Sequence, residues 1–204
     1  YLVLTNISYS QIDHAFDVKF ALNHIKIQVS LGPRSITMPE TKALTHQYIV
    51  NTLSKYTNRL ISQPFEYNKL KGNNIWATFP RENKSGTDMR FMLGAHWDTR
   101  PQSELDDNQK NRDLPSPGAN DGGSGVAMLL EIARILSMKP APVTVDLIFF
   151  DLEDLGNIDD LPFAIGAEQF VKKNSFYKPD KGIIVDMVCD KNLVIPKELF
   201  SKKY

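Results

Sequence analysis

Several features are scarce in this chain of 204 residues, and each scarcity excludes a class of protein. Cys189 is the only cysteine, so the chain can form neither an internal disulfide nor a cysteine-ligated zinc cluster. Lys plus Arg number 24, as do Asp plus Glu, so the net charge of zero provides no basic field for nucleic acid. The apolar runs are far shorter than the roughly 20 residues that a membrane-spanning helix needs.

The bulk composition describes one ordinary folded domain. Hydrophobic residues make up 42% of the chain, enough for a sizeable core in a domain of this length. No repeat, linker or secretory signal is visible, and a start at Tyr1 rather than Met indicates a processed or trimmed chain. We therefore expect a single domain over residues 1–204. The lone cysteine fits a cytosolic or an exported protein, and we expect a periplasmic or extracellular location rather than a cytoplasmic one.

Alternating helical and strand-like patterns predict an α/β fold. Helical periodicity predicts helices at 10–30, 40–56, 124–138 and 166–173. β-Branched and aromatic runs predict strands at 59–67, 74–79, 89–97, 143–150 and 182–188, the last two of them buried. A polar turn is expected at 82–88, and a long surface loop at 101–119.

Polar side chains of the kind that bind metals lie at or near the ends of three predicted strands. His96 and Asp98 close the strand at 89–97, Glu153 and Asp154 follow the strand at 143–150, and Asp186 lies in the strand at 182–188. Open α/β sheets bind ligands at the carboxyl ends of their strands. Imidazole and carboxylate groups gathered at one such edge predict a metal site, for which zinc is the best match.

Each of these signals has a simpler alternative. On a strand, residues two apart share a face, so Asp98 can accept the second ring N–H of His96; the alternative is a surface histidine beside a turn. Asp121 precedes Gly122 and a predicted helix, where it can bind a metal or, like Asn120, simply cap the helix.

The remaining carboxylates also allow two interpretations. Of the adjacent pair Glu153 and Asp154, one can bind metal while the other acts as a base, or both can be solvated loop charges. Asp186 places a charge in an apolar strand, where an unpaired carboxylate is costly. It should therefore be paired, protonated or bound to metal.

Together these segments resemble the superfamily of zinc aminopeptidases and glutaminyl-peptide cyclotransferases. The resemblance runs from about Phe20 to the end of the chain. Its motifs are Gly32-Pro33-Arg34, Gly94-Ala95-His96-Trp97-Asp98, Gly118-Ala119-Asn120-Asp121-Gly122-Gly123-Ser124-Gly125, Phe149-Phe150-Asp151-Leu152-Glu153-Asp154 and Ile183 to Met187. The resemblance implies a three-layer α/β/α sandwich around a mixed, mostly parallel sheet.

The resemblance also implies roles for individual residues, around one zinc ion or two. Asp121 is implied as a ligand that bridges if two ions are present, Asp154 as a further ligand and Glu153 as the general acid/base. In the peptidase branch His96 and Asp186 would hold a second metal, whereas in the cyclotransferase branch Asp186 would join a hydrogen-bond network with the substrate. Asp98 would support His96.

Two features favour the cyclotransferase branch. Peptidase relatives usually carry two adjacent glutamates, whereas this chain has Glu153-Asp154. Bacterial cyclotransferase-like proteins often show the motifs found here at 149–154 and 94–101. We therefore expect an enzyme that converts the N-terminal glutamine of a peptide or protein to pyroglutamate with release of ammonia. A two-zinc aminopeptidase and a non-catalytic domain of the same fold remain the alternatives.

One departure from the family concerns its last metal ligand, a histidine well after the strand that carries Asp186. The other histidines of this chain are His14, His24 and His46, and none matches that ligand. We therefore expect the chain to lack the family's C-terminal strands and last helix.

Overall fold

The computed structural model of the protein describes residues 16–82 and 88–194. Its elements, in chain order, are α1 (Val18–Leu31), α2 (Pro39–Leu53), β1 (Leu60–Tyr67), β2 (Leu70–Phe79), β3 (Arg90–His96), the 3₁₀ helix η2 (Gln109–Asn111), α3 (Gly123–Met138), β4 (Thr144–Phe150), α4 (Ile165–Lys173) and β5 (Lys181–Ile184). Residues 10–15 of the first predicted helix, and most of the turn predicted at 82–88, lie outside the described residues.

The five strands form one sheet in the order β1-β2-β4-β3-β5. Strand β2 pairs antiparallel with β1 and β4, while β3 pairs parallel with β4 and β5. Within the described chain, β2 alone therefore runs against the other strands. The predicted α/β class with a mixed sheet is confirmed, and two of the four strand pairings are parallel.

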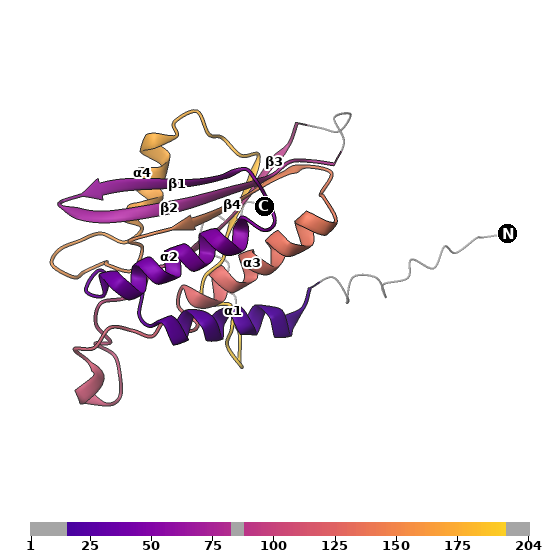
Figure 1. The fold of residues 1–204 in the computed structure, drawn as a ribbon. Coiled ribbons are helices and arrows are strands. Elements are labelled where there is room, and N and C mark those ends of the chain that lie inside the picture. Colours follow the sequence, from indigo (N-terminus) through magenta and orange to yellow (C-terminus); the bar gives the residue numbers. More distant parts are fainter. Residues whose placement is uncertain (1–15, 83–87, 195–204) are drawn as a thin grey trace.

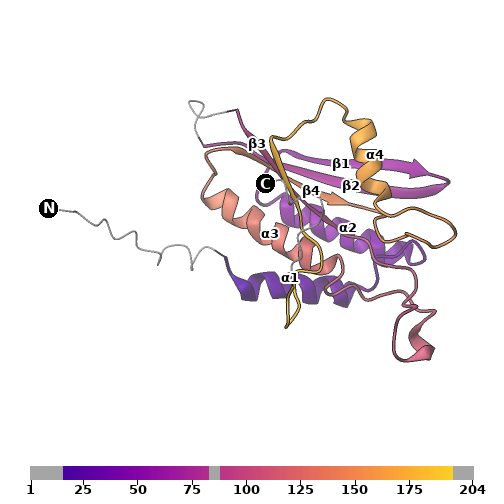
Figure 2. The ribbon, with the colours of Figure 1, turned by 180° about the vertical axis from the view of Figure 1, so that it is seen from behind.

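Helices cover both faces of this sheet. Figures 1 and 2 show α1, α2 and α3 on one side and α4 on the other. Because alternate residues of a strand point to opposite faces, β4 supplies Leu147 and Phe149 to the core under α2 and α3. It supplies Ile148 and Phe150 to the cluster around Phe170 of α4. This strand is therefore central and buried on both faces, as its continuous apolar run predicts.

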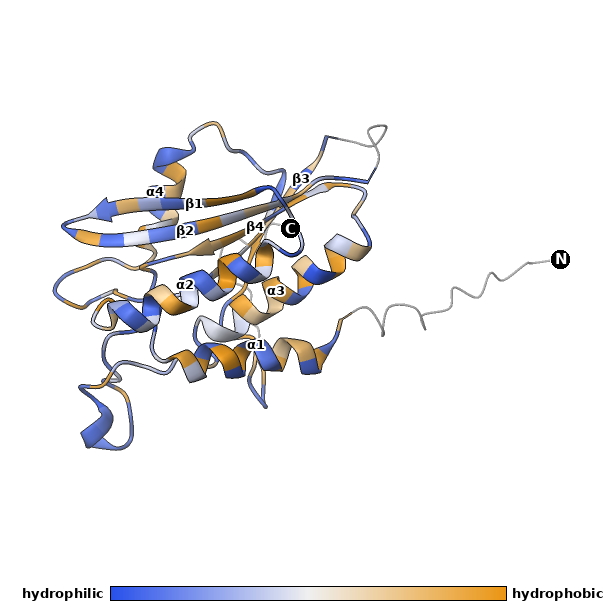
Figure 3. Ribbon diagram, in the orientation of Figure 1, coloured by the Kyte–Doolittle hydropathy of each residue, from blue (hydrophilic) through white to orange (hydrophobic). Residues whose placement is uncertain are grey.

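The loop predicted at 101–119 is confirmed as a connection between β3 and α3. Its one regular element is η2, whose residues are not buried. Figure 3 shows this segment as a largely hydrophilic projection away from the layers of the domain. In the described part of the chain, no helix is long and apolar enough to cross a membrane.

Helix α1 corrects one expectation. The apolar periodicity predicts that Phe16, Val18 and Phe20 pack on the domain, yet Val18 is 62% exposed, and the buried residues of the helix are His24 and Gln28. The reason is a set of polar contacts. The His24 ring bonds the Tyr48 hydroxyl at 2.5 Å, and the Gln28 amide donates to the Gly123 carbonyl at 3.1 Å.

Strand β5 corrects another expectation. The strand predicted at 182–188 is shorter, and its Ile183 and Ile184 are 58% and 57% exposed. Among the described residues β5 pairs with β3 alone, so it is an edge strand with one open side. The chain leaves the sheet after Val185, whose amide donates to the Gly94 carbonyl. Asp186 therefore lies just beyond a strand end, as Glu153 and Asp154 do after β4.

Candidate metal centre

Three of the predicted site residues meet at the carboxyl edge of the sheet. The Nε2 atom of His96 lies 2.9 Å from an oxygen of Asp121 and 3.3 Å from an oxygen of Asp186. The three potential ligand atoms all lie within 4.8 Å of one another. His96 ends β3, Asp121 precedes α3 and Asp186 follows β5, so three segments distant in sequence supply one imidazole and two carboxylates.

The parallel pairing of β3 with β5 brings His96 and Asp186 together, because both strands end at the same edge. A tight turn before α3 brings Asp121. Gly122 in that turn has φ +70, and a Cβ there would lie 2.9 Å from the Asp98 carbonyl oxygen and 3.1 Å from the His96 ring. Glycine is therefore required for the turn to approach His96 so closely.

The helix-cap alternative for Asn120 and Asp121 is wrong. The N-cap of α3 is Gly122, with no side-chain hydrogen bond to the helix start. The Asn120 side-chain oxygen instead accepts from the backbone N–H of Cys189 at 2.9 Å. The Asp121 carboxylate, 42% exposed, contacts His96. The role of Asp121 as a metal ligand stays a prediction, and this contact places its carboxylate beside the imidazole.

Asp98 holds the turn that follows β4. One oxygen of its buried carboxylate accepts the backbone N–H of Glu153 at 3.0 Å, and the other accepts that of Asp154 at 3.1 Å. Asp98 also lies beside His96, as predicted, but its oxygen is 3.5 Å from Nδ1, which has no hydrogen bond to the described residues. Its contact with His96 is therefore electrostatic, while its hydrogen bonds position the Glu153-Asp154 pair.

The carboxylates of Glu153 and Asp154 stand in a strongly acidic setting. Burial is the main cause that raises the pKa of Asp154 to about 7, and the charges of Asp121 and Asp98 raise it further. Burial likewise raises the pKa of Glu153, with Asp98 and Asp186 adding to the effect. The side chain of Asp154 lies 3.4 Å from the Arg100 guanidinium and is not part of the three-residue cluster.

The donor set fits zinc. Asp121 and Asp186 both direct an oxygen at Nε2 of His96, although one N–H can serve only one of them well. Burial alone would lower the pKa of His96, but its bonds to these carboxylates raise that pKa well above the usual value. A cation among nitrogen and oxygen ligands would relieve this crowding of negative charge, and zinc accepts such ligands.

The same residues lie in segments shared with known proteins. The model of the family described as "Peptidase family M28" matches residues 74–200, well over half of the chain. The chain belongs to peptidase family M28. The predicted superfamily is thereby confirmed.

Solved structures similar to this M28 chain are named either as glutaminyl cyclases or as peptidases. Porphyromonas gingivalis glutaminyl cyclase is 34% identical, with a TM-score of 0.82 over 93% of this chain and 67% of that chain. A Bacteroides thetaiotaomicron glutaminyl cyclase bound to N-acetylhistamine and a leucine aminopeptidase precursor from the same organism are each 32% identical over 92% of this chain and 68% of theirs. Their TM-scores are 0.79 and 0.78.

Two further relatives extend this comparison. A Zn-dependent exopeptidase from Parabacteroides distasonis is 33% identical, with a TM-score of 0.74 over 87% of this chain and 63% of that chain. Aminopeptidase YwaD of Bacillus subtilis is 49% identical over 41 residues, which are 20% of this chain and 9% of that protein. The chain thus spans about two thirds of the solved relatives and far less of the curated one. The names of these relatives describe cyclases, aminopeptidases and one Zn-dependent exopeptidase, so this M28 chain belongs to a family of enzymes in which zinc is implied.

The M28 site also depends on Arg34, a residue that sequence reasoning connected only with the family motif. Its fully buried guanidinium donates to the backbone carbonyls of Trp97 at 2.9 Å, Pro117 at 3.0 Å, Gly118 at 2.7 Å and Asp121 at 3.4 Å. Burial lowers the pKa of Arg34 to about 10, so the group stays charged at neutral pH. It ties the end of β3 to the turn that carries Asp121.

Substituting Arg34→Met is expected to lower the free energy of unfolding by about 3 kcal/mol or more, because several buried carbonyls lose their donor. Arg34→Lys should recover only part of this loss, since one ammonium cannot reproduce the planar fork. Chemical denaturation of both variants measures the effect. Stability of Arg34→Met equal to that of the wild type would show that water replaces the guanidinium without cost.

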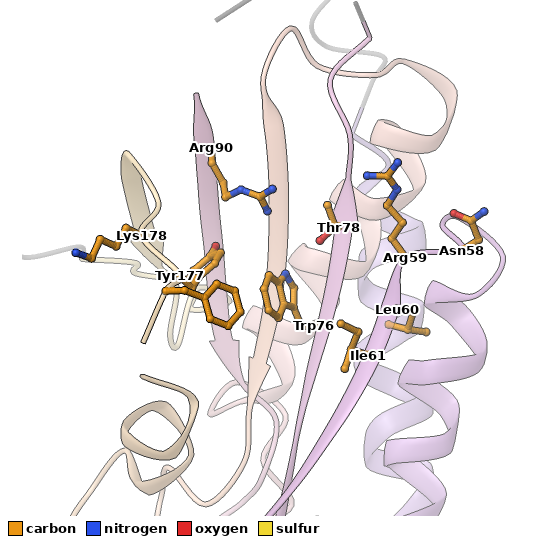
Figure 4. Close-up of a pocket in the computed structure, with 10 residues that line it drawn as sticks. Asn58, Arg59, Leu60, Ile61, Trp76, Thr78, Arg90, Tyr177 and Lys178 are labelled. Atoms are coloured by element: carbon orange, nitrogen blue, oxygen red, sulfur yellow. The ribbon is translucent and has the colours of Figure 1, made fainter. Parts of the chain in front are cut away.

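A separate cavity of about 540 Å³ lies near the other end of β3, where that strand begins at Arg90 (Figure 4). Beneath it, the buried carboxylate of Asp146 accepts hydrogen bonds from Trp76, Thr78, Arg90 and Tyr177 at 2.6–2.9 Å. Every oxygen of Asp146 is therefore satisfied by groups that line the cavity. This network joins β2, β3 and β4 to the segment after α4 and is structural, and the apolar pattern of β4 did not reveal it.

Proposed function

We propose that this chain forms the metal-binding part of a zinc-dependent glutaminyl-peptide cyclotransferase. The observation that carries the proposal is the Glu153-Asp154 pair, whose backbone is fixed by Asp98 at the metal edge. Aspartate in the second position, where peptidase relatives usually carry glutamate, retracts the carboxylate by one methylene. This retraction suits a site built around a single ion. The names of several similar structures support the same activity.

In this proposal Asp121 and Asp154 would hold the zinc, while the imidazole of His96 contacts the carboxylates of Asp121 and Asp186. When bound, zinc supplies a Lewis acid that polarises the side-chain amide of an N-terminal glutamine. Glu153 accepts a proton from the substrate's α-amine, whose nitrogen forms a bond to the amide carbon. Glu153 then passes the proton to the departing ammonia. The products are a pyroglutamyl peptide and ammonia, and no water is consumed.

Two features suit these roles. The raised pKa of Glu153 makes its carboxylate a better proton acceptor than an exposed glutamate. Asp186 is about half exposed and hydrogen-bonded to His96, so it can orient the substrate's polar groups from the side opposite β4. The substrate class in this proposal is a peptide or protein with an N-terminal glutamine.

A two-zinc aminopeptidase is the second candidate. One observation favours it, because His96, Asp121 and Asp186 by themselves offer three converging ligands. In such an enzyme Asp121 would bridge two ions, and Glu153 would activate a water molecule. Several similar solved structures are named as an aminopeptidase or as exopeptidases.

A side-by-side assay separates the two candidates. We expect the protein to release ammonia from peptides that begin with glutamine faster than it hydrolyses leucine anilides, with one zinc bound per chain. The physical reason is that cyclisation takes its nucleophile from the substrate, whereas hydrolysis requires an activated water. Two zincs per chain and rapid anilide hydrolysis without ammonia release would instead identify an aminopeptidase.

A further inference from the structure

A buried ion pair lies behind the turn that carries Glu153. Nζ of Lys42, from α2, is 2.7 Å from an oxygen of Asp151, and their side chains are only 12% and 1% exposed. Neither residue was assigned a specific role from the sequence. A buried ion pair is costly to form because both charges lose their hydration. Its position beside the turn that carries Glu153 therefore indicates a specific role.

Asp151 fixes the first half of the turn. Its carboxylate accepts the backbone N–H of Leu152 and that of Asn73, both at 2.8 Å, and its own N–H donates to Asn74 at 3.0 Å. Leu152 has φ +53, a left-handed conformation that costs free energy for a side chain of this size. Asp151 therefore holds the chain in a shape that it would not adopt alone.

Asp98 fixes the second half of the turn through the N–H groups of Glu153 and Asp154. The segment 151–154 is thus clamped between two buried carboxylates, Asp151 at one end and Asp98 at the other. These two carboxylates repel each other, since the charge of Asp98 makes ionisation of Asp151 harder. The buried carboxylate of Asp151 therefore needs a positive charge beside it.

Lys42 supplies that charge. Burial raises the pKa of Asp151 to about 6, and the ammonium of Lys42 is the first of the effects that oppose this rise. Lys42 is itself held over the Trp97 ring, 5.3 Å from the ring centroid. It therefore links α2 to the ends of both β3 and β4.

We propose that Lys42 is a positioning residue, which acts through Asp151 to hold Glu153 in its catalytic orientation. The expected effect of Lys42 on kcat rests on the proposed function, whereas its expected effect on the rigidity of the turn does not. Loss of the ammonium leaves Asp151 buried without a cation, and the turn should relax around Leu152. Glu153 then loses its fixed position, although it keeps its chemistry.

The experiment compares Lys42→Met and Lys42→Arg with the exposed control Lys172→Met, whose ion pair with Glu168 lies on the surface of α4. We expect Lys42→Met to accelerate amide hydrogen exchange in 151–156 and to lower kcat by about 10–100-fold while KM changes little. Lys42→Arg should restore much of the protection from exchange and much of kcat, because it retains the charge. Lys172→Met should resemble the wild type.

A double variant guards against simple misfolding. Lys42→Met with Asp151→Asn removes both charges, so it should be more stable than Lys42→Met alone. The proposal is overturned if Lys42→Met changes neither the amide hydrogen exchange of 151–156 nor kcat. It is also overturned if amide hydrogen exchange in β4 rises as much as in 151–156. Faster exchange in 151–156, in a protein that cyclises no glutaminyl peptide, would refute the proposed function and uphold the positioning role.

Discussion

Replacing Glu153 with Gln is expected to lower kcat by about 10²–10⁴-fold, the usual contribution of a general acid/base. The amide has nearly the same shape as the carboxylate but cannot accept a proton from the substrate's amine. The backbone N–H of Glu153 still donates to Asp98, so the turn and the zinc content should stay intact. Steady-state kinetics and zinc analysis of the purified variant measure both expectations.

The matched control for this variant is Glu168→Gln. Glu168 is a half-exposed glutamate of α4, paired with Lys172 and not part of the cluster. Its substitution should leave kcat unchanged. If Glu153→Gln kept more than about half of the wild-type activity, against the scale expected for a proton-transfer group, Glu153 would not be the acid/base.

Asp121→Ala is expected to remove zinc from the purified protein and, with it, all turnover. The substitution takes away a carboxylate that lies 2.9 Å from His96, the oxygen ligand closest to the imidazole. The backbone of the turn should survive, because the Arg34 guanidinium bonds the carbonyl of Asp121 rather than its side chain. Zinc per chain, measured by elemental analysis, decides the question.

Asp159→Ala serves as the comparison for Asp121→Ala. Asp159 is an exposed residue in the loop before α4. Its variant should bind zinc as the wild type does. Undiminished zinc in Asp121→Ala would mean that this carboxylate only forms an ion pair with His96 and that other residues hold the zinc.

The convergence of His96 and Asp186 could be predicted from the sequence because it follows from a general property of sheets, whereas Asp121 joins them through the turn before α3. Strands that run parallel end at one edge, and polar residues at those ends are carried together whatever the rest of the fold does. The same reasoning placed Glu153 and Asp154 beside the cluster. It could not assign them roles, because the direction of each side chain depends on the turn between them.

Other contacts and exposures in the structure could not be predicted from the sequence. Arg34 bonds carbonyls, which every residue carries, so no partner residue type signals the contact. Lys42 and Asp151 are more than a hundred positions apart and look like ordinary charges. An apolar strand reads the same at an edge as at the centre of a sheet, which is why the exposure of Ile183 in β5 was not foreseen.

The carbonyl contacts of Arg34 have a consequence for the order of folding. They join positions 63 to 87 residues apart, so the chain must close long loops before any of these bonds can form. Loop closure of this kind is slow compared with the growth of a helix or a hairpin, and contacts of high sequence separation govern the folding rate. The β1–β2 hairpin and α3 are local and can form early. The turn that presents Asp121 becomes rigid only when residues 34, 97 and 118 have met, so the carboxylate of Asp121 reaches its place beside His96 late in folding.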